Sequence, residues 1–448
     1  MVPSVQETLF QYISAHLPAY QKRWEQTYTQ LNDCTRLQDT PGIQEVIIAQ
    51  LQDYAMKTRL LGANGPLIYG ELHTDAPATL LFYTPYDTGY HASRQVVPLS
   101  TGLAALDAYQ AAIGPLPVNI KWVFDAAGTS GTPDLATIIA EFRTLLQADG
   151  CIWSMPEQSE EEEAGIALLA PGTKGLLRVE LTVQTADDQA HDETLAMHGA
   201  VVPDAAWRLT WALNHLKGAH EEILIEGFYD TLVSAEDDEV ALLYTLPDNT
   251  QAQARRWGLQ QLLLGLQGFQ FHYAHLLTPS CTISNISSGN RSENTSYAPA
   301  TIPTRAQAQV DFYLVPGQDP HDIFAKLQQH LQAQGFPDVQ ARLLYAIPPA
   351  HTPLNDPFVQ LVRQASIAAY GDALRVLPGT AETYPLYPFR DILKMPVVII
   401  TEGSSDKTQK ARNNNQELPQ PELPNIASRI KQMAMIIEGI GHAAHTTQ

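Results

Sequence analysis

The chain has 448 residues, and 48 Asp and Glu against 27 Lys and Arg give it a net charge of −21. This length predicts two domains, and a hydrophobic content of 44% is typical of a globular protein. The negative charge argues against nucleic acid and anionic membranes as partners, because both select for clusters of Lys and Arg. Three scattered cysteines without a CxxC pair argue against a disulfide framework and against a cysteine zinc site.

The sequence also carries no signal for a membrane or for export. The first twenty residues have no basic segment followed by an apolar core. No apolar run reaches the roughly 18 residues that a membrane helix needs. We therefore expect a cytoplasmic protein.

The first 150 residues alternate between two kinds of pattern. Apolar positions at helical spacing predict helices over 5–31 and 43–57. Short runs rich in β-branched and aromatic residues then predict strands, and longer periodic runs predict helices between them. These are strands at 66–72, 78–85 and 118–126, and helices at 99–114 and 134–147. The alternation predicts an α/β fold, with a mixed sheet whose parallel pairs are covered by helices.

The pattern changes near Pro171 and changes back near Pro353. Between them, runs at 175–185 and 304–317 alternate apolar and polar residues, which predicts strands of a sheet with one solvated face. Helices are predicted at 205–217 and 320–335, so this part predicts a smaller α+β sandwich. The earlier pattern then returns, with a helix at 357–371, a strand at 396–403 and a helix at 425–441. We predict one domain from 1–173 and 350–448, interrupted by a second from 174–349.

Four stretches together resemble a known family. They are "LLFYTPYDTGY" (80–90), "LPVNIKWVFDAAGTSGTPDL" (116–135), "PGTKGLLRVELTV" (171–183) and "ATIPTRAQAQVDFYLVPGQDPHDIFAKLQQHL" (300–331). In order and spacing the chain is similar to the M20 metallopeptidases, which include dipeptidases, carboxypeptidases and aminoacylases. The resemblance implies a zinc-exopeptidase-like domain with two zinc ions, interrupted by a dimerisation and lid domain, and it implies a homodimer.

The residues at the implied metal positions do not follow the family. A zinc pair needs carboxylates and imidazoles, with one carboxylate bridging the two ions. The implied ligand and base positions carry Pro85, Pro98, Gly128, Thr129 and Met155, and the last ligand falls on Lys410 or Arg412. A lysine or arginine there repels a metal cation. We therefore expect no zinc and no other cofactor.

The remaining candidates could line a reused cleft. Asp87 can accept hydrogen bonds from the backbone or from nearby cations, or it can act with His91 as an acid–base pair. The arginine that clamps a substrate carboxylate in the family is replaced by Tyr313, and the lid histidine could be His191 or His198. The candidate ligand-binding residues are Asp87, His91, Arg94, Tyr313, Lys410 and Arg412.

These observations predict an M20-like pseudoenzyme. It would lack the di-zinc site and bind a small molecule, a peptide or a protein partner, and it would form a homodimer through the inserted domain. The alternative from another class is a hydrolase that cleaves a small amide or peptide through a reorganised cleft. That alternative requires Asp87, His91 and the cations at 410–412 to converge in one pocket.

Overall fold

A computed structural model describes residues 3–37, 39–63, 65–86, 92–126, 133–154, 166–186, 194–289, 301–401 and 423–446. The chain divides into two compact units, which are described separately. Unit 1 comprises Met1–Thr173, Glu236–Phe269 and Ala350–Gln448. Unit 2 comprises Lys174–Ala235 and Gln270–Pro349.

Unit 1 is built on an eight-stranded mixed sheet with the order β1-β2-β4-β3-β5-β14-β6-β13. Strand β3 runs parallel to β4 and β5, and β14 runs parallel to β5, whereas β1, β2 and β6 introduce antiparallel pairs. The predicted mixed sheet with parallel pairs is confirmed. The strands are β1 (Lys57–Leu61), β2 (Leu67–Leu72), β3 (Ala78–Pro85), β4 (Val118–Asp125), β5 (Gly150–Ser154), β6 (Ala167–Ala170), β13 (Leu374–Val376) and β14 (Val397–Ile400).

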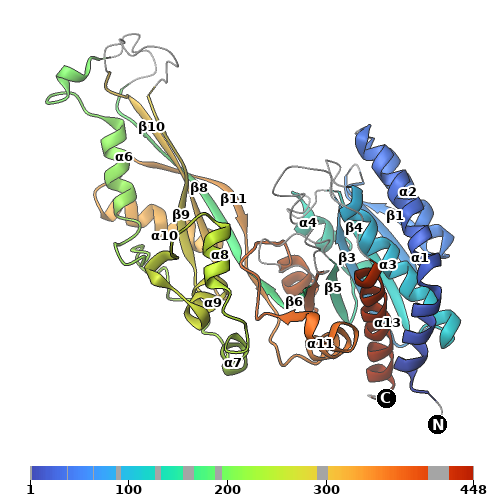
Figure 1. The fold of residues 1–448 in the computed structure, drawn as a ribbon. Helices are drawn as coiled ribbons and strands as arrows, with labels where there is room; N and C mark the ends of the chain where they lie inside the picture. Colours follow the sequence, from blue (N-terminus) through green and yellow to red (C-terminus); the bar gives the residue numbers. More distant parts are fainter. Residues whose placement is uncertain are drawn as a thin grey trace. The chain divides into compact units, whose positions relative to one another are not determined.

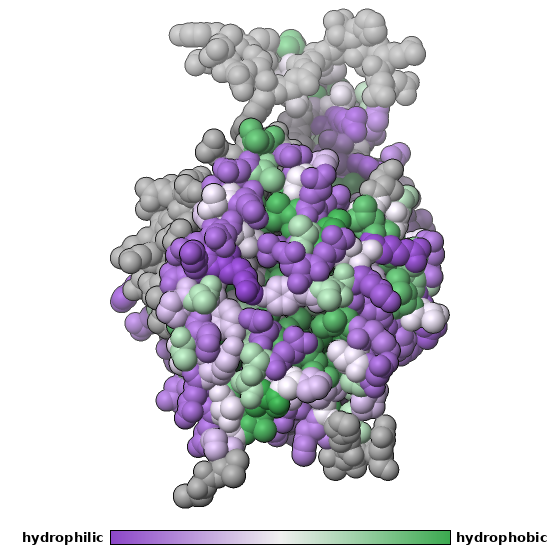
Figure 2. All heavy atoms as spheres, turned by 90° about the vertical axis from the view of Figure 1, so that its right-hand side faces the viewer, coloured by the Kyte–Doolittle hydropathy of each residue, from purple (hydrophilic) through white to green (hydrophobic). Residues whose placement is uncertain are grey.

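Helices cover both faces of this sheet. Helices α1, α3 and α13 lie side by side over one face (Figure 1), and α11 joins their core. On the opposite face α4 and the π-helix η5 enclose a second core with Tyr83, Trp153 and Phe389. The helices of this unit are α1 (Val5–Arg36), α2 (Thr40–Asp53), α3 (Ala92–Ala112), α4 (Leu135–Glu141), α5 (Arg143–Leu146), α11 (Pro357–Tyr370), η5 (Pro388–Ile392) and α13 (Leu423–Thr446). Where these helices face solvent, hydrophilic residues cover most of the surface and apolar ones are interspersed (Figure 2).

Several boundaries differ from the prediction for local reasons. Helix α3 begins at Ala92, earlier than the predicted start at residue 99, and contains Pro98. Proline has no backbone N–H and so removes one helical hydrogen bond, but it does not end the helix here. The predicted helix at 43–57 ends at Asp53, and the chain turns into edge strand β1. The predicted helix at 134–147 breaks at Phe142 into α4 and α5. No helix in the described ranges has the length and apolar character of a membrane span.

The segment Glu236–Phe269 was placed in the inserted domain by sequence, but its contacts assign it to unit 1. It holds α7 (Asp237–Leu243), α8 (Thr250–Arg256) and the short 3-10 helix η3 (Leu263–Gly265). Buried Glu239 of α7 lies 2.5 Å from Nε2 of His351, next to the strand pair β7 (Gly172–Thr173) and β12 (Ala350–His351). This contact joins residues 112 positions apart, which no local pattern reveals.

Unit 2 is a two-layer α+β sandwich, as predicted. Its antiparallel sheet has the order β11-β8-β10-β9, and α6 and α10 pack against one face. Alternation places Leu177, Val179 and Leu181 under the helices and leaves Arg178 and Glu180 on the other face. The elements are β8 (Gly175–Gln184), η2 (Ala196–His198), α6 (Ala205–Asn214), β9 (Ser280–Ser288), β10 (Arg305–Leu314), α10 (Pro320–Ala333) and β11 (Gln340–Ile347), and α9 (Gly268–Leu277) leads into β9.

The ends of α10 show how sequence sets these elements. The carboxylate of Asp319 caps the helix by accepting from the backbone N–H groups of His321 and Asp322, and Pro320 occupies the first turn. Gly335 follows the helix with φ of +84°, a conformation that glycine adopts without strain.

Candidate functional site

The carboxyl ends of the parallel strands in unit 1 form the first candidate site. In open α/β sheets, ligands bind outside these ends, where neighbouring strands send the chain to opposite sides. The chain leaves β3 toward β4 and leaves β5 toward β6, so this switch point lies between β3 and β5. The described residues here include Tyr86 after β3, Asp125 at the end of β4, Ser154 at the end of β5 and Thr401 after β14.

Asp125 is fully buried and engaged by a neighbour on the adjacent strand. The phenol of Tyr83 donates to Oδ2 of Asp125 at 2.5 Å. Burial raises the pKa of Tyr83 well above its usual value, and the nearby carboxylate of Asp125 raises it further. This phenol therefore keeps its proton. Asp125 also receives the backbone N–H of Tyr86 at its carbonyl, at 2.8 Å. The pair fixes the ends of β3 and β4 against each other.

On the other face of the sheet, a buried arginine ties the ends of β5 and β14 to two helices. Arg429 of α13 is 0% exposed, and its Nη2 donates to Oγ of Ser154 at 2.7 Å. Its Nη1 donates to Oε1 of Gln432 at 2.9 Å and lies 3.5 Å from the carbonyl of Thr401. Gln432 in turn donates to Oγ of Ser366 on α11 at 2.7 Å. All of these partners are neutral, and within the described ranges no acceptor contacts Nε of Arg429.

Most sequence-predicted site residues lie outside the described residues. These are Asp87, His91, Gly128, Thr129, Met155, His191, Lys410 and Arg412, and for Arg94 the structure describes only the backbone in α3. Two of the replaced positions are described. Pro85 ends β3 and is buried, and Pro98 is buried inside α3. Neither side chain has a donor atom for a metal. In the described part of the chain, no three His, Cys, Asp or Glu side chains come together as a metal site would require.

The remaining two candidates, Tyr313 and His198, lie in unit 2. Tyr313 is half-buried on the sheet face that the helices leave uncovered. His198 ends the short helix η2 and is exposed. Next to Tyr313, Arg178 and Asp311 form a bidentate ion pair with distances of 2.8 and 2.9 Å, which the sequence reasoning missed. The hydrogen bonds that Arg178 donates to Asp311 raise the pKa of the guanidinium above its usual value.

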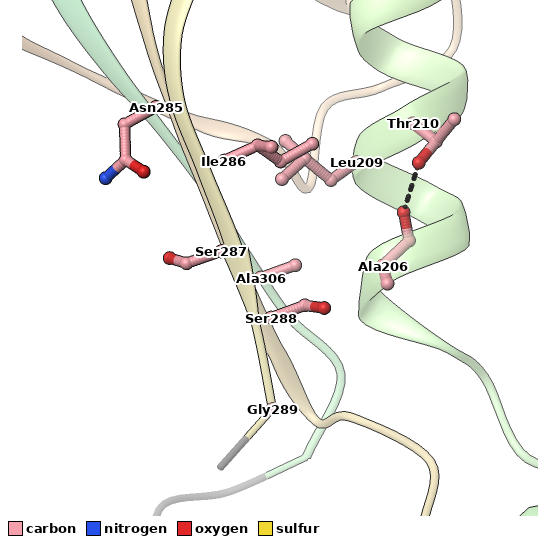
Figure 3. Close-up of a pocket in the computed structure, with 9 residues that line it drawn as sticks. All are labelled: Ala206, Leu209, Thr210, Asn285, Ile286, Ser287, Ser288, Gly289 and Ala306. Carbon is pink, nitrogen blue, oxygen red and sulfur yellow. Dashed lines mark hydrogen bonds between the residues drawn. The ribbon is translucent and has the colours of Figure 1, made fainter. Parts of the chain in front are cut away.

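A groove between α6 and β9 is the second candidate site. It has a volume of about 650 Å³ and is lined by Ala206, Leu209, Thr210, Ala306 and residues 285–289. In Figure 3, Ile286 and Leu209 point toward each other across the groove, whereas Asn285 and Ser287 point to the other face of the strand. β9 is an edge strand on which every residue but Cys281 is exposed.

The two elements that border this groove carry exposed large apolar side chains. Ile286 is 56% exposed, and Trp207 and Trp211 of α6 are 59% and 52% exposed, with ring centroids 6.0 Å apart. The two tryptophans therefore do not pack under their own sheet. Exposed aromatic residues and a strand at the edge of its sheet, here β9 among the described strands, are both features of protein–protein interfaces.

Comparison with known proteins relates this architecture to peptidases. Residues 172–339 match the family model of the peptidase dimerisation domain. No curated protein matches the chain. An M20 family metallo-carboxypeptidase from Sulfolobus solfataricus is similar in structure, with 23% identity, a TM-score of 0.73 and coverage of 90% of this chain and 96% of the other. The dipeptidase Dug1p from Saccharomyces cerevisiae has 15% identity, a TM-score of 0.72 and coverage of 98% and 99%.

Human carnosine dipeptidase 1 is a third similar structure, with 15% identity, a TM-score of 0.69 and coverage of 98% and 100%. The fold is therefore that of the M20 metallopeptidases over nearly the whole chain, including the dimerisation domain. At these identities the similarity concerns the fold, and the chemistry has to be argued from the residues of this chain.

Proposed function

We propose that this chain is a non-catalytic relative of the M20 peptidases, which binds a ligand at the carboxyl ends of β3 and β5 without a zinc pair. One observation carries the proposal. The buried guanidinium of Arg429 lies against Ser154, the residue directly before Met155. The family resemblance implies an aspartate ligand at position 155. A fixed positive charge next to that position opposes a divalent cation, because repulsion in a low-dielectric interior is strong.

The residues do not fit the zinc pair that the fold implies. Pro85 and Pro98 stand at two implied ligand positions, are buried, and offer no lone pair to a metal. Asp125, the described carboxylate at the end of β4, is hydrogen-bonded to Tyr83. We therefore derive no hydrolytic step through a metal-bound water.

The alternative is a hydrolase that uses Asp87 and His91 in place of the metals. The test is hydrolysis of dipeptides and of N-acyl amino acids by the full-length chain, with and without added zinc. The proposal predicts no turnover in either condition. Turnover that survives a chelator and is lost in both Asp87→Ala and His91→Ala would favour the alternative hydrolase. Turnover that requires zinc would contradict the proposal.

A homodimer through unit 2 is the second part of the proposal. The match to the dimerisation domain, the edge position of β9 and the groove beside it support it. Two copies of β9 related by a two-fold axis would satisfy each other's backbone groups. Each copy would then cover the other's Ile286, which is 56% exposed. The expected interface is therefore isologous.

A further inference from the structure

Residues 244–269 of unit 1 form a loop whose two ends lie together. The ring of Tyr244, directly after α7, stacks on the ring of Phe269 with centroids 4.1 Å apart. Near this contact in the chain, a Cβ added at Gly268 would lie 3.6 Å from the carboxylate of Asp248. Helix α8 and the short helix η3 lie between these two ends. The loop is thus closed at its base, and we call residues 255–265 its tip.

The tip presents large apolar side chains to solvent. Leu263 and Leu264 are 58% and 64% exposed, and Trp257 and Leu259 are exposed as well. Only Leu262 of the tip is buried. Soluble proteins commonly expose single apolar residues, whereas several together mark a surface that binds a partner or a membrane. The tip is therefore a candidate docking surface.

The backbone holds Leu264 in a conformation that leucine rarely adopts. Its φ and ψ are 53° and 14°, in the left-handed region, and Gly265 follows with φ of 69°. This region is unfavourable for a residue with a Cβ. Packing of the side chain does not compensate for the strain, because most of Leu264 is exposed. Strained positions of this kind are concentrated at functional sites.

The tip also lies in the longest stretch of the chain without an acidic residue. No Asp or Glu occurs between Asp248 and Glu293, although these two types make up 48 of the 448 residues. Exposed Arg255 and Arg256 end α8 and directly precede Trp257. The tip therefore carries two positive charges and no negative one. Because salt screens charges beyond about 10 Å at 0.1 M, this local charge matters more for a docking surface than the net charge of the chain.

We propose that the tip docks on an anionic lipid bilayer. Leucine and tryptophan side chains are those that enter the boundary between headgroups and acyl chains, and the adjacent arginines would meet the lipid phosphates. A second copy of this chain fits the tip less well, because a two-fold contact would bring the same arginines together. The contact would be peripheral, since no described helix could span a membrane.

This inference goes beyond the proposed function and corrects an expectation from composition. The net charge of −21 argues against anionic membranes only if the charge is spread evenly, and at the tip it is not. The ligand site at the strand ends and the dimer through unit 2 play no part in the argument. Either can therefore fail without affecting it.

The probes are vesicles of phosphatidylcholine that contain about one third phosphatidylserine, and vesicles of phosphatidylcholine alone. The full-length chain is sedimented with increasing amounts of each at about 0.1 M salt. We expect binding to the mixed vesicles to be at least about tenfold tighter than to the neutral ones, because each arginine adds its attraction to the anionic surface. The difference should vanish at about 1 M salt.

Two variants test the two parts of the tip. Leu264→Asn should weaken binding to the mixed vesicles at least about tenfold, while the thermal midpoint stays the same or rises, because asparagine tolerates the left-handed region. The double variant Arg255→Gln, Arg256→Gln should lose the preference for the mixed vesicles. Ile367→Asn and Arg143→Gln are the matched controls. Both change exposed residues of unit 1 outside the loop and should bind as the wild type does.

The inference is overturned if the wild type does not sediment with the mixed vesicles, if it binds both kinds of vesicle equally, or if Leu264→Asn binds as the wild type does. A lower thermal midpoint in Leu264→Asn would also overturn it, because the leucine would then serve the fold. The same holds if Leu264→Asn lowers the sedimenting mass of the protein without lipid, since the tip would then lie between copies of the chain.

Discussion

Arg178 on β8 and Asp311 on β10 lie directly opposite each other, and both oxygens of the carboxylate accept from the guanidinium. The side chain of Asp311 is only 6% exposed, whereas that of Arg178 is 38% exposed. The carboxylate is thus the buried member, and it depends on the arginine for its hydrogen bonds on the otherwise solvated face of this sheet.

Removing Arg178 alone should therefore cost more than removing the pair. Arg178→Met leaves a buried carboxylate unpaired and should lower the free energy of unfolding by about 3 kcal/mol. The double variant Arg178→Met, Asp311→Leu should recover most of that loss. Urea unfolding of both variants and of Asp311→Leu completes a double-mutant cycle. Equal losses in Arg178→Met and in the double variant would show that the ion pair does not stabilise unit 2.

The contact between Glu239 and His351 gives a prediction about pH. Burial alone would raise the pKa of Glu239, but the hydrogen bond and charge of His351 outweigh it and lower that pKa below its usual value. A carboxyl group with a lowered pKa stabilises the folded state above its unfolded pKa, and this stabilisation is lost as the pH falls through the folded pKa. Glu239→Gln should cost about 2 kcal/mol at neutral pH.

This cost should shrink as the pH falls below the unfolded pKa of a glutamate, about 4.3, because the pKa of Glu239 is lowered in the folded protein. Urea unfolding from pH 7 to pH 3.5 measures it. Exposed Asp238 in the same helix turn is the matched control, and Asp238→Asn should change the free energy of unfolding by no more than about 0.5 kcal/mol. A loss in Glu239→Gln that grows as the pH falls below about 4.3 would contradict the assignment.

The groove of unit 2 predicts a dimer that one charge disrupts. Ile286→Asp places a carboxylate in the proposed interface twice, because the interface is isologous. Sedimentation at micromolar concentration should show the wild type near twice 49.3 kDa and the variant near 49.3 kDa. Ile367→Asp is the control, because Ile367 on α11 of unit 1 is also an isoleucine and is similarly exposed, at 48%. A monomeric wild type, or a dimer that survives Ile286→Asp, would remove this interface from the account.

Helix α3 lies close to the sheet at Gly102. A Cβ at this position would lie 2.3 Å from the ring of Trp122, which is fully buried on β4. Because the ring cannot move away in a packed core, Gly102→Ala should destabilise by about 1–3 kcal/mol, despite the better helix propensity of alanine. Thermal unfolding checks this. A stabilised Gly102→Ala would mean that α3 packs less closely on β4.

Sequence patterns predicted the elements whose apolar residues repeat regularly. The strands at 66–72, 78–85 and 118–126 agree with β2, β3 and β4 within one residue at each end. They could be predicted because buried strands have continuous apolar runs. The position of Glu236–Phe269 could not, because it depends on side-chain contacts between distant residues.

At the candidate site, the sequence predicted only which metal-ligand positions of the family carry other residues. Position by position, the family resemblance identified the prolines at 85 and 98, but it gave no reason to examine α13. A signal was nevertheless present. Arg429 lies on the apolar stripe formed by Ile426, Ile430 and Met433, all of which are buried. A charged residue on such a stripe indicates a buried cation, which composition and motifs do not show.

The most direct test of the central claim is the zinc content of the full-length protein purified without a chelator. Elemental analysis should find far less than one zinc per chain, because prolines stand at two implied ligand positions and Arg429 places a positive charge next to a third. Stoichiometric zinc that is lost in Asp87→Ala would contradict the account and restore a metal-dependent hydrolase.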